Sequence, residues 1–277
     1  MPENDHHAAW PAAMTIAGSD SGGGAGIQAD LKTFAALGVF GTSAITAITA
    51  QNTVEVRNAL HLPPALVAEQ MRAVIDDIAP RAAKTGMLAN RTIIRAIVEV
   101  LVEHPELPVV VDPVAFTSTG YPLLEADAVG SLKEELMPLA TVITPNLREA
   151  SALTGIEISD DDDMRRAAEA LLEAGARAVL VKGGHREDSA DDLLMDSNGE
   201  TWFRAKHLDT RHTHGTGCSL SAAIAAGLAR GLSLHDATEH AKQFVHQGML
   251  AGYVVGSGHS PINHFHAFQE IIERMYQ

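Results

Sequence analysis

The sequence has a single cysteine, Cys218, and few aromatic residues, which make up 4% of its 277 positions. One cysteine excludes an intramolecular disulfide and a cysteine-based zinc site. No uninterrupted apolar run reaches the roughly 18 residues that a membrane helix needs, and the acidic first residues lack the basic start of a secretory signal. We therefore expect a cytoplasmic protein that spans no membrane.

Basic residues are also scarce: lysine and arginine number 20 against 35 aspartates and glutamates, so the formal net charge is −15. An acidic surface repels nucleic-acid phosphates, and we expect no nucleic-acid partner. A small anion can still bind, because a few backbone N–H groups suffice to hold it. With 46% hydrophobic residues, the composition is otherwise that of an ordinary globular protein.

Apolar runs and helical patterns alternate along the chain. Strands are predicted at residues 14–17, 43–50, 109–112, 141–144 and 178–182, followed by a hairpin of residues 193–196 and 201–204. Helices are predicted at residues 25–37, 65–78, 92–103, 124–136, 161–174, 218–228, 234–254 and 265–276. This alternation predicts a mostly parallel sheet covered on both faces, a three-layer α/β/α sandwich. We expect a tail at residues 1–12 and a single domain at residues 13–277.

A glycine-rich stretch at residues 17–30 follows the first predicted strand and opens a helix. Its glycines would let backbone N–H groups approach an anionic ligand at the start of that helix. Gly24, Gly26 and Ala29 also fit a loose dinucleotide fingerprint. A dehydrogenase is nevertheless disfavoured, because the second strand ends at Gln51 without the carboxylate that would hold the ribose.

Two polar residues near this stretch are candidates for substrate binding. Asp30 falls inside the apolar stripe of its helix, where an unpaired carboxylate is costly, so it either pairs locally or faces a ligand pocket. We favour the pocket. Gln51 ends a strand at the edge where open α/β sheets bind ligands, and its amide matches a ring nitrogen beside an amine. The alternative for Gln51 is a solvated strand end.

Carboxylates recur at the ends of later strands. Asp112 ends one strand, and Asn146 and Glu149 stand three apart at the start of a helix. Together such carboxylates suit a hydrated Mg²⁺ ion, although each alone could equally cap a helix. The acidic run at residues 160–163 lacks the glycine and distal glutamate of a calcium loop, and we interpret it as a helix cap.

A second glycine turn, Gly215-Thr216-Gly217, runs into an alanine-rich helix that must be buried. Successive N–H groups at such a turn form an anion-binding nest, which suits the charge of a phosphoryl group in transfer. Cys218 would lie in the first helical turn, where the helix dipole lowers a thiol pKa; the alternative is an inert buried cysteine. The charged residues 185–191 suggest a mobile flap.

The histidine pairs His212/His214 and His264/His266 lack the spacing and the nearby acidic ligand of a metal site. Nor does the sequence contain a P-loop motif.

Taken together, these motifs resemble the ribokinase superfamily, and specifically its hydroxymethylpyrimidine/phosphomethylpyrimidine kinases. The resemblance runs from about Thr15 to His266. Its motifs are residues 17–34 (AGSDSGGGAGIQADLKTF), 49–53 (TAQNT), 84–88 (KTGML), 111–114 (VDPV), 144–150 (TPNLREA), 181–185 (VKGGH) and 214–218 (HGTGC).

The resemblance implies a ribokinase-like fold and two ATP- and Mg²⁺-dependent phosphorylations in thiamin biosynthesis. The first acts on 4-amino-5-hydroxymethyl-2-methylpyrimidine, and the second converts its monophosphate to the diphosphate. The substrate-binding residues would be Gly26, Asp30, Gln51, Met87 and Val114. A homodimer is also implied, because relatives commonly form one.

The remaining roles are implied in the same way. Asp112 and Glu149 would organise Mg²⁺ and its waters. The nucleotide contacts would come from Asn146, Lys182 and Thr216. The catalytic groups would be the anion hole of Gly215, Thr216 and Gly217, together with Cys218, which stands where many relatives carry an aspartate base. We therefore expect Cys218 to contribute to turnover without being indispensable.

Two alternatives remain open. Pyridoxal kinase activity occurs in this subgroup, but its cysteine-assisted type carries a second cysteine in the loop that here spans residues 115–120 and has none. The chain could also be a non-catalytic ligand sensor on the same fold, although a pure binder needs no anion hole for a transferring group.

Overall fold

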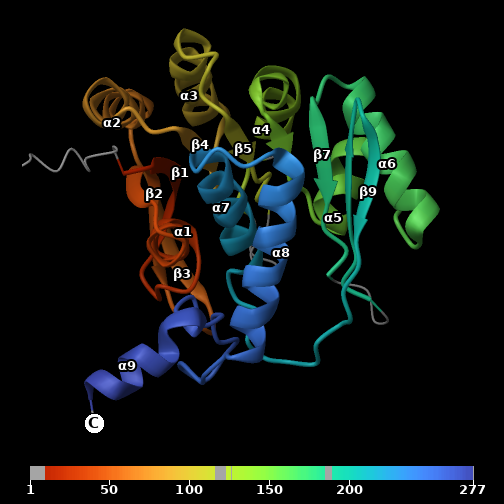
Figure 1. The fold of residues 1–277 in the computed structure, drawn as a ribbon. Coiled ribbons are helices and arrows are strands. Elements are labelled where there is room, and N and C mark those ends of the chain that lie inside the picture. Colours follow the sequence, from red (N-terminus) through yellow and green to blue (C-terminus); the bar gives the residue numbers. More distant parts are fainter. Residues whose placement is uncertain (1–9, 116–122, 126, 185–188, 277) are drawn as a thin grey trace, which may run out of the picture.

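A single nine-stranded sheet forms the centre of the protein (Figure 1). The computed structural model describes residues 10–115, 123–125, 127–184 and 189–276. The strand order is β3-β2-β1-β4-β5-β6-β7-β8-β9. In chain order the strands are β1 (Ala12–Asp20), β2 (Phe40–Gln51), β3 (Val56–His61), β4 (Ala82–Thr85), β5 (Val109–Val111), β6 (Val142–Ile143), β7 (Ala178–Val181), β8 (Asp192–Asp196) and β9 (Gly199–Phe203).

Six neighbouring strands, in the sheet order β2-β1-β4-β5-β6-β7, run parallel, and antiparallel strands close both edges of the sheet. β3 pairs antiparallel with β2, and the β8–β9 hairpin pairs antiparallel with β7. The parallel strands therefore all end at one edge of the sheet, where loops from distant parts of the sequence meet.

Helices cover both faces of the sheet and enclose two hydrophobic cores. One face is covered by α2 (Pro64–Ile78), α3 (Arg91–Glu103), α4 (Ala128–Ser131), α5 (Leu147–Thr154) and α6 (Asp161–Glu173). The other is covered by α1 (Gly26–Ala36), α7 (Thr216–Ala229) and α8 (Leu234–Leu250). Figure 1 shows α9 (Gln269–Met275) projecting from the body of the molecule. The predicted three-layer α/β/α sandwich is confirmed.

Two strands escaped prediction, and one helix was predicted too long. β3 has an exposed, polar pattern, and β4 contains a buried lysine, so neither has the continuous apolar run that marks a parallel strand. The helix predicted at residues 124–136 begins only at Ala128, because Leu124 instead forms an isolated bridge with Ala89. Its second half, Leu132–Leu136, is a π-helical turn.

The other predicted elements are present, with ends shifted by a few residues. The acidic run at residues 160–163 does cap a helix, since the Asp160 side chain accepts a hydrogen bond from the Asp163 N–H. In the described parts of the chain, no helix has the length and apolar character needed to cross a bilayer.

Candidate active site

A cavity of about 630 Å³ opens at the edge where the parallel strands end. Its walls come from the ends of β1 and β2, the loops after β4, β5 and β6, and the first turn of α7. It is the position at which open α/β sheets hold their ligands. Most of the predicted site residues line this cavity, although they come from seven separate segments of the chain.

At one end of the cavity lie four residues expected to hold a substrate: Gly26, Gln51, Met87 and Val114. Gly26 has φ +57, and a Cβ there would lie 2.3 Å from the carbonyl oxygen of Gly18. Only glycine therefore fits at the start of α1. The Gln51 side chain is half-buried, and its Oε1 accepts a hydrogen bond of 3.2 Å from Thr49.

A charged cluster occupies the centre of the cavity wall. Lys182 Nζ lies 2.8 Å from Asp112 Oδ1, and the carboxylate also accepts hydrogen bonds from Thr144 (3.2 Å) and Ser221 (3.3 Å). Burial lowers the pKa of Lys182, but the charges of Asp112 and Glu149 outweigh this and raise it. Lys182 is therefore a fixed positive charge that faces the cavity.

Glu149 belongs to the cavity wall and to a helix cap at the same time. The Asn146 side chain accepts a hydrogen bond from the Glu149 N–H (2.9 Å), and Glu149 Oε2 accepts one from the Asn146 N–H (2.8 Å). This capping box fixes the start of α5. Burial raises the pKa of Glu149 to about 7, with Lys182 opposing the shift and Asp112 adding to it.

The first turn of α7 points its backbone into the cavity. Gly215 is in the left-handed conformation (φ +75), and Thr216 Oγ1 donates to the carbonyl of Thr213 (3.0 Å). A Cβ at Gly217 would lie 3.3 Å from Lys182 Nζ, so glycine brings the helix start against the lysine. The first N–H groups of a helix have no intrahelical partner. Here the Thr216 N–H donates to the Thr213 carbonyl (3.3 Å), which leaves those of Gly217 and Cys218 for an anion.

The expected low pKa of Cys218 is wrong. Burial raises the pKa of this thiol to about 11, although the charge of Lys84 opposes the shift. The predicted position of Cys218 in the first turn of α7 is confirmed. However, desolvation of the thiol raises its pKa more than the helix dipole lowers it. Cys218 is also absent from the cavity lining, and at neutral pH it is a protonated thiol.

Asp30 lies elsewhere than expected. It is fully buried and absent from the cavity lining. Its carboxylate accepts hydrogen bonds from Lys84 Nζ (3.0 and 2.9 Å) and from Thr15 Oγ1 (2.6 Å). The alternative of a local cap or local partner does not describe this geometry either, because the ion pair is formed with a distant residue. The partner stands 54 positions away in β4, so helical periodicity could not have found it.

The first glycine-rich loop holds a carboxylate of the protein itself. The N–H groups of Gly22 (2.7 Å), Gly24 (3.1 Å) and Ala25 (2.9 Å) all donate to Asp20. These groups were expected to reach a ligand, and they are already satisfied. Asp20 was not singled out, although its place at the end of β1 matched that of Asp112 at the end of its own strand.

Other charged residues along the cavity carry no sequence signal. Lys242 of α8 lies 2.6 Å from Asp192 of β8 and also donates to the carbonyl of Ala190, so it joins the helix to the sheet edge. Arg148 and Lys206 also line the cavity. Of the predicted flap at residues 185–191, residues 185–188 lie outside the described parts of the chain.

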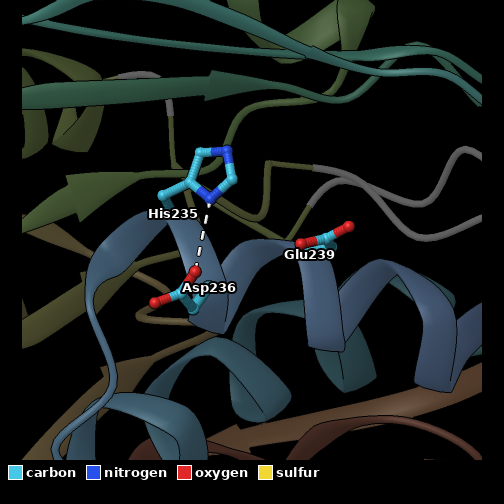
Figure 2. A group of neighbouring side chains, drawn as sticks. All are labelled: His235, Asp236 and Glu239. Carbon is cyan, nitrogen blue, oxygen red and sulfur yellow. Dashed lines mark ion pairs between the residues drawn. The ribbon is translucent and has the colours of Figure 1, made fainter.

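The histidine pairs are accounted for by contacts inside the protein. His214 Nε2 lies 3.1 Å from Asp20 Oδ2, and His264 Nε2 lies 3.0 Å from Ser219 Oγ. Away from the cavity, His235, Asp236 and Glu239 lie close together at the start of α8 (Figure 2). All three are exposed, and Asp236 already pairs with His235 and accepts a hydrogen bond from the Ser233 hydroxyl.

Comparison with known proteins gives one consistent result. The sequence model of the phosphomethylpyrimidine kinase family matches residues 20–263. A hydroxymethylpyrimidine/phosphomethylpyrimidine kinase of Streptomyces coelicolor is 49% identical over 260 residues, which cover 94% of this chain and 96% of that protein.

Two solved structures are similar in fold. The phosphomethylpyrimidine kinase of Clostridium difficile is 44% identical, with a TM-score of 0.77 over 86% of this chain and 98% of that one. The ADP complex of Bacillus subtilis pyridoxal kinase is 36% identical, with a TM-score of 0.86 over 94% of this chain and 100% of that one. With its motifs gathered around one cavity and a family match over most of its length, the chain belongs to the phosphomethylpyrimidine kinase family.

Proposed function

We propose that the protein transfers the γ-phosphoryl group of ATP to 4-amino-5-hydroxymethyl-2-methylpyrimidine and then to its monophosphate, in thiamin biosynthesis. The observation that carries this proposal is the meeting of Lys182, Asp112 and the first turn of α7 at one wall of the cavity. A fixed ammonium beside free backbone N–H groups stabilises the charge of a phosphoryl group in transfer.

The acceptor would bind at the end of the cavity formed by Gln51, Met87 and Val114. The Gln51 amide offers a donor and an acceptor side by side, which matches an aminopyrimidine edge. The Met87 and Val114 side chains offer an apolar surface to the ring. Asp30 has no part in this binding, because it is committed to Lys84.

ATP would lie against α7 and α8. Leu220, Val245 and Met249 give that wall an apolar surface for the base, and the triphosphate would reach toward the start of α7. Gly217 and Cys218 would then contact the phosphates through their backbone N–H groups, with Thr216 beside them, while Lys182 would supply the positive charge. Asn146 stands beside them, with its Oδ1 held in the capping box.

The donor set also fits Mg²⁺. Asp112 and Glu149 are oxygen ligands on one cavity wall, and the charge of Asp112 helps to raise the pKa of Glu149, so the pair concentrates negative charge that a cation relieves. Bound there, Mg²⁺ would neutralise charge on the phosphates.

In the first reaction, the hydroxymethyl oxygen bonds to the γ-phosphorus while the bond to the ADP oxygen breaks, and the hydroxyl proton passes to water. In the second, an oxygen of the monophosphate bonds to the γ-phosphorus. A thiol with a pKa of about 11 is a poor acceptor for that proton. We therefore place the main contribution in positioning and charge stabilisation by Lys182 and the α7 backbone, which dominate phosphoryl transfer in general.

A coupled ADP-release assay with Mg-ATP tests the proposal. The acceptors are the hydroxymethylpyrimidine, its monophosphate and pyridoxal. We expect turnover of both pyrimidines and slow turnover of pyridoxal. Fast turnover of pyridoxal alone would assign the protein to vitamin B6 salvage, as the structural similarity to pyridoxal kinase would then suggest. Binding of nucleotide without turnover of any acceptor would instead indicate a sensor.

We also propose a homodimer, located in the cytoplasm. Ile48 and Leu60 lie directly opposite each other on β2 and β3, and their exposed fractions are 48% and 65%. Phe40 of β2 is likewise exposed, by 56%. An exposed apolar pair such as Ile48 and Leu60 at the edge of a sheet is typical of a surface that a second chain covers.

A further inference from the structure

Asp20 and His214 form a buried contact between two loops that are 194 positions apart in the sequence. Asp20 ends β1, and His214 directly precedes the glycine turn that opens α7. His214 Nε2 lies 3.1 Å from Asp20 Oδ2, and the two side chains are 12% and 4% exposed. Neither residue has a role in the phosphoryl transfer described above.

Asp20 holds the first loop rigid. Three of its hydrogen bonds come from backbone N–H groups within the next five residues. Burial would raise the pKa of Asp20, but the hydrogen bonds from His214, Gly22 and Ala25 outweigh it and lower the pKa. The carboxylate is therefore ionised at neutral pH and accepts from both loops at once.

The two loops also touch backbone to backbone. A Cβ at Gly215 would lie 1.9 Å from the carbonyl oxygen of Gly24, and a Cβ at Gly24 would lie 2.3 Å from Cδ2 of the His214 ring. No side chain fits between them. The start of α7 therefore packs directly against the first loop, and the His214 ring fills the remaining space.

His214 is held from a third side as well. Its N–H donates to the carbonyl of Ser260 (3.2 Å), and it forms a bridge with Pro261. Its ring and its backbone therefore join the first loop, the glycine turn and the C-terminal segment. The N–H groups of Gly217 and its neighbours follow directly, so their direction depends on where His214 is held.

We propose that His214, held by Asp20, is the positioning residue that aims the backbone N–H groups of the α7 glycine turn at the transferring phosphoryl group. This inference rests on the proposed phosphoryl transfer. It gives the first glycine-rich loop a structural role, because the loop, through Asp20, then holds the anion-binding turn of α7 in place. A small displacement of such donors reduces the stabilisation of the transition state far more than it reduces the binding of the ground state.

His214→Ala and His214→Gln test the proposal together. Glutamine keeps an N–H donor at about the reach of Nε2, whereas alanine removes it. His235→Ala is the matched control, because His235 is an exposed histidine outside the cavity. For His214→Ala we expect kcat to fall by about a hundredfold while both KM values stay within about threefold. His214→Gln should recover most of the loss, and His235→Ala should match the wild type.

Hydrogen exchange without ligands gives a readout independent of turnover. His214→Ala should speed exchange by about tenfold or more in both loops, at residues 22–25 and at Thr216 and Ser219, whose N–H groups donate to the Thr213 and Gly215 carbonyls. His214→Gln should restore protection. The proposal is overturned if exchange in the two loops is unchanged, or if glutamine behaves like alanine. It is also overturned if the KM for ATP rises while kcat holds, since His214 would then contact the donor itself.

The two proposals can fail separately. A wild-type protein that turns over no acceptor refutes the kinase function, and the exchange experiment still decides whether His214 holds the two loops together.

Discussion

At the scale of single residues, the protonation state of Cys218 decides how the site can work. Since burial raises its pKa to about 11, its thiolate fraction at pH 7 is far below that of a free cysteine. We expect iodoacetamide to alkylate it at least about a hundredfold more slowly than free cysteine, with the rate rising as the pH approaches 11. Mass spectrometry of the modified chain measures this directly.

The control for Cys218 is the same reaction in urea, where the unfolded chain should react at the rate of free cysteine. Fast labelling of the folded protein at pH 7 would show that Cys218 is a thiolate at this pH, and it could then act as the base. Cys218→Ala should keep measurable turnover, because the charge of the transferring group is stabilised by other residues.

His264 should make the stability of the protein depend on pH. The residue is buried, and burial, Lys32 and His266 together lower its pKa to about 4 from the ordinary 6.5. The neutral His264 side chain contributes to the free energy of unfolding, and this contribution is fully present above about pH 6.5. It is lost as the pH falls toward 4, because in this range the unfolded chain binds a proton at His264 and the folded chain does not. The loss amounts to about 3 kcal/mol.

Urea unfolding of the wild type and of His264→Gln, at several pH values between 4 and 7, isolates this effect. Glutamine can keep the hydrogen bond to Ser219 but does not titrate. The stability advantage of the wild type should shrink as the pH falls. A constant difference across this range would show that His264 is not held neutral.

At the scale of elements, the ion pair of Asp30 and Lys84 connects α1 to β4 inside the core. Burial lowers the pKa of Lys84, but the charge of Asp30 outweighs it and raises the pKa. Lys84→Met should destabilise the fold by about 3–5 kcal/mol, because it leaves Asp30 buried without its partner. Denaturant unfolding monitored by circular dichroism measures the loss.

The double variant Asp30→Leu/Lys84→Met gives the decisive comparison. Removing both charges should recover more than half of the lost stability, since an apolar pair of similar volume replaces the ions. If the double variant is no more stable than Lys84→Met alone, the pair is not the reason for the loss.

The same pair shows what the sequence could and could not predict. The alternation of strands and helices predicted the layers, and Asp112, Asn146 and Glu149 after the ends of strands predicted a shared site at one sheet edge. Lys182 was implied only by the family resemblance. The pairing of Lys84 with Asp30 depends on how helix α1 packs against the sheet at β4, which no local pattern encodes. β4 was missed for that reason: its lysine looks unsuited to a buried strand until its partner is known.

The two glycine-rich loops differ in a way that no sequence pattern could show. Both fit an anion-binding pattern, because the pattern records only where N–H groups can be exposed. What those groups face is set by tertiary contacts. Both loops line the cavity, but in the first loop the N–H groups of Gly22, Gly24 and Ala25 donate to Asp20, so they are not free for an anion.

At the scale of the whole molecule, the exposed apolar surface on β2 and β3 should govern assembly. We expect the wild type to run as a dimer of its 29.3 kDa chain in light scattering. Leu60→Glu should shift it to monomer, because a charge cannot be buried there without a partner. Val102→Glu is the control, as Val102 of α3 is similarly exposed, by 59%, on another face. A Leu60→Glu protein that stays dimeric would place the interface elsewhere.

The contact between Asp20 and His214 has a consequence for how the protein is made. A ribosome adds about 5–20 residues per second, so the first loop leaves it roughly 10–40 seconds before its partner, 194 positions later, has been synthesised. The parallel strands can pair during that interval, while the start of α7 does not yet exist. A nascent chain halted before residue 214 can therefore hold most of the sheet and still have no catalytic centre. The site can therefore form only after the start of α7 has been synthesised, and any truncation from the C-terminal side that reaches His214 removes it.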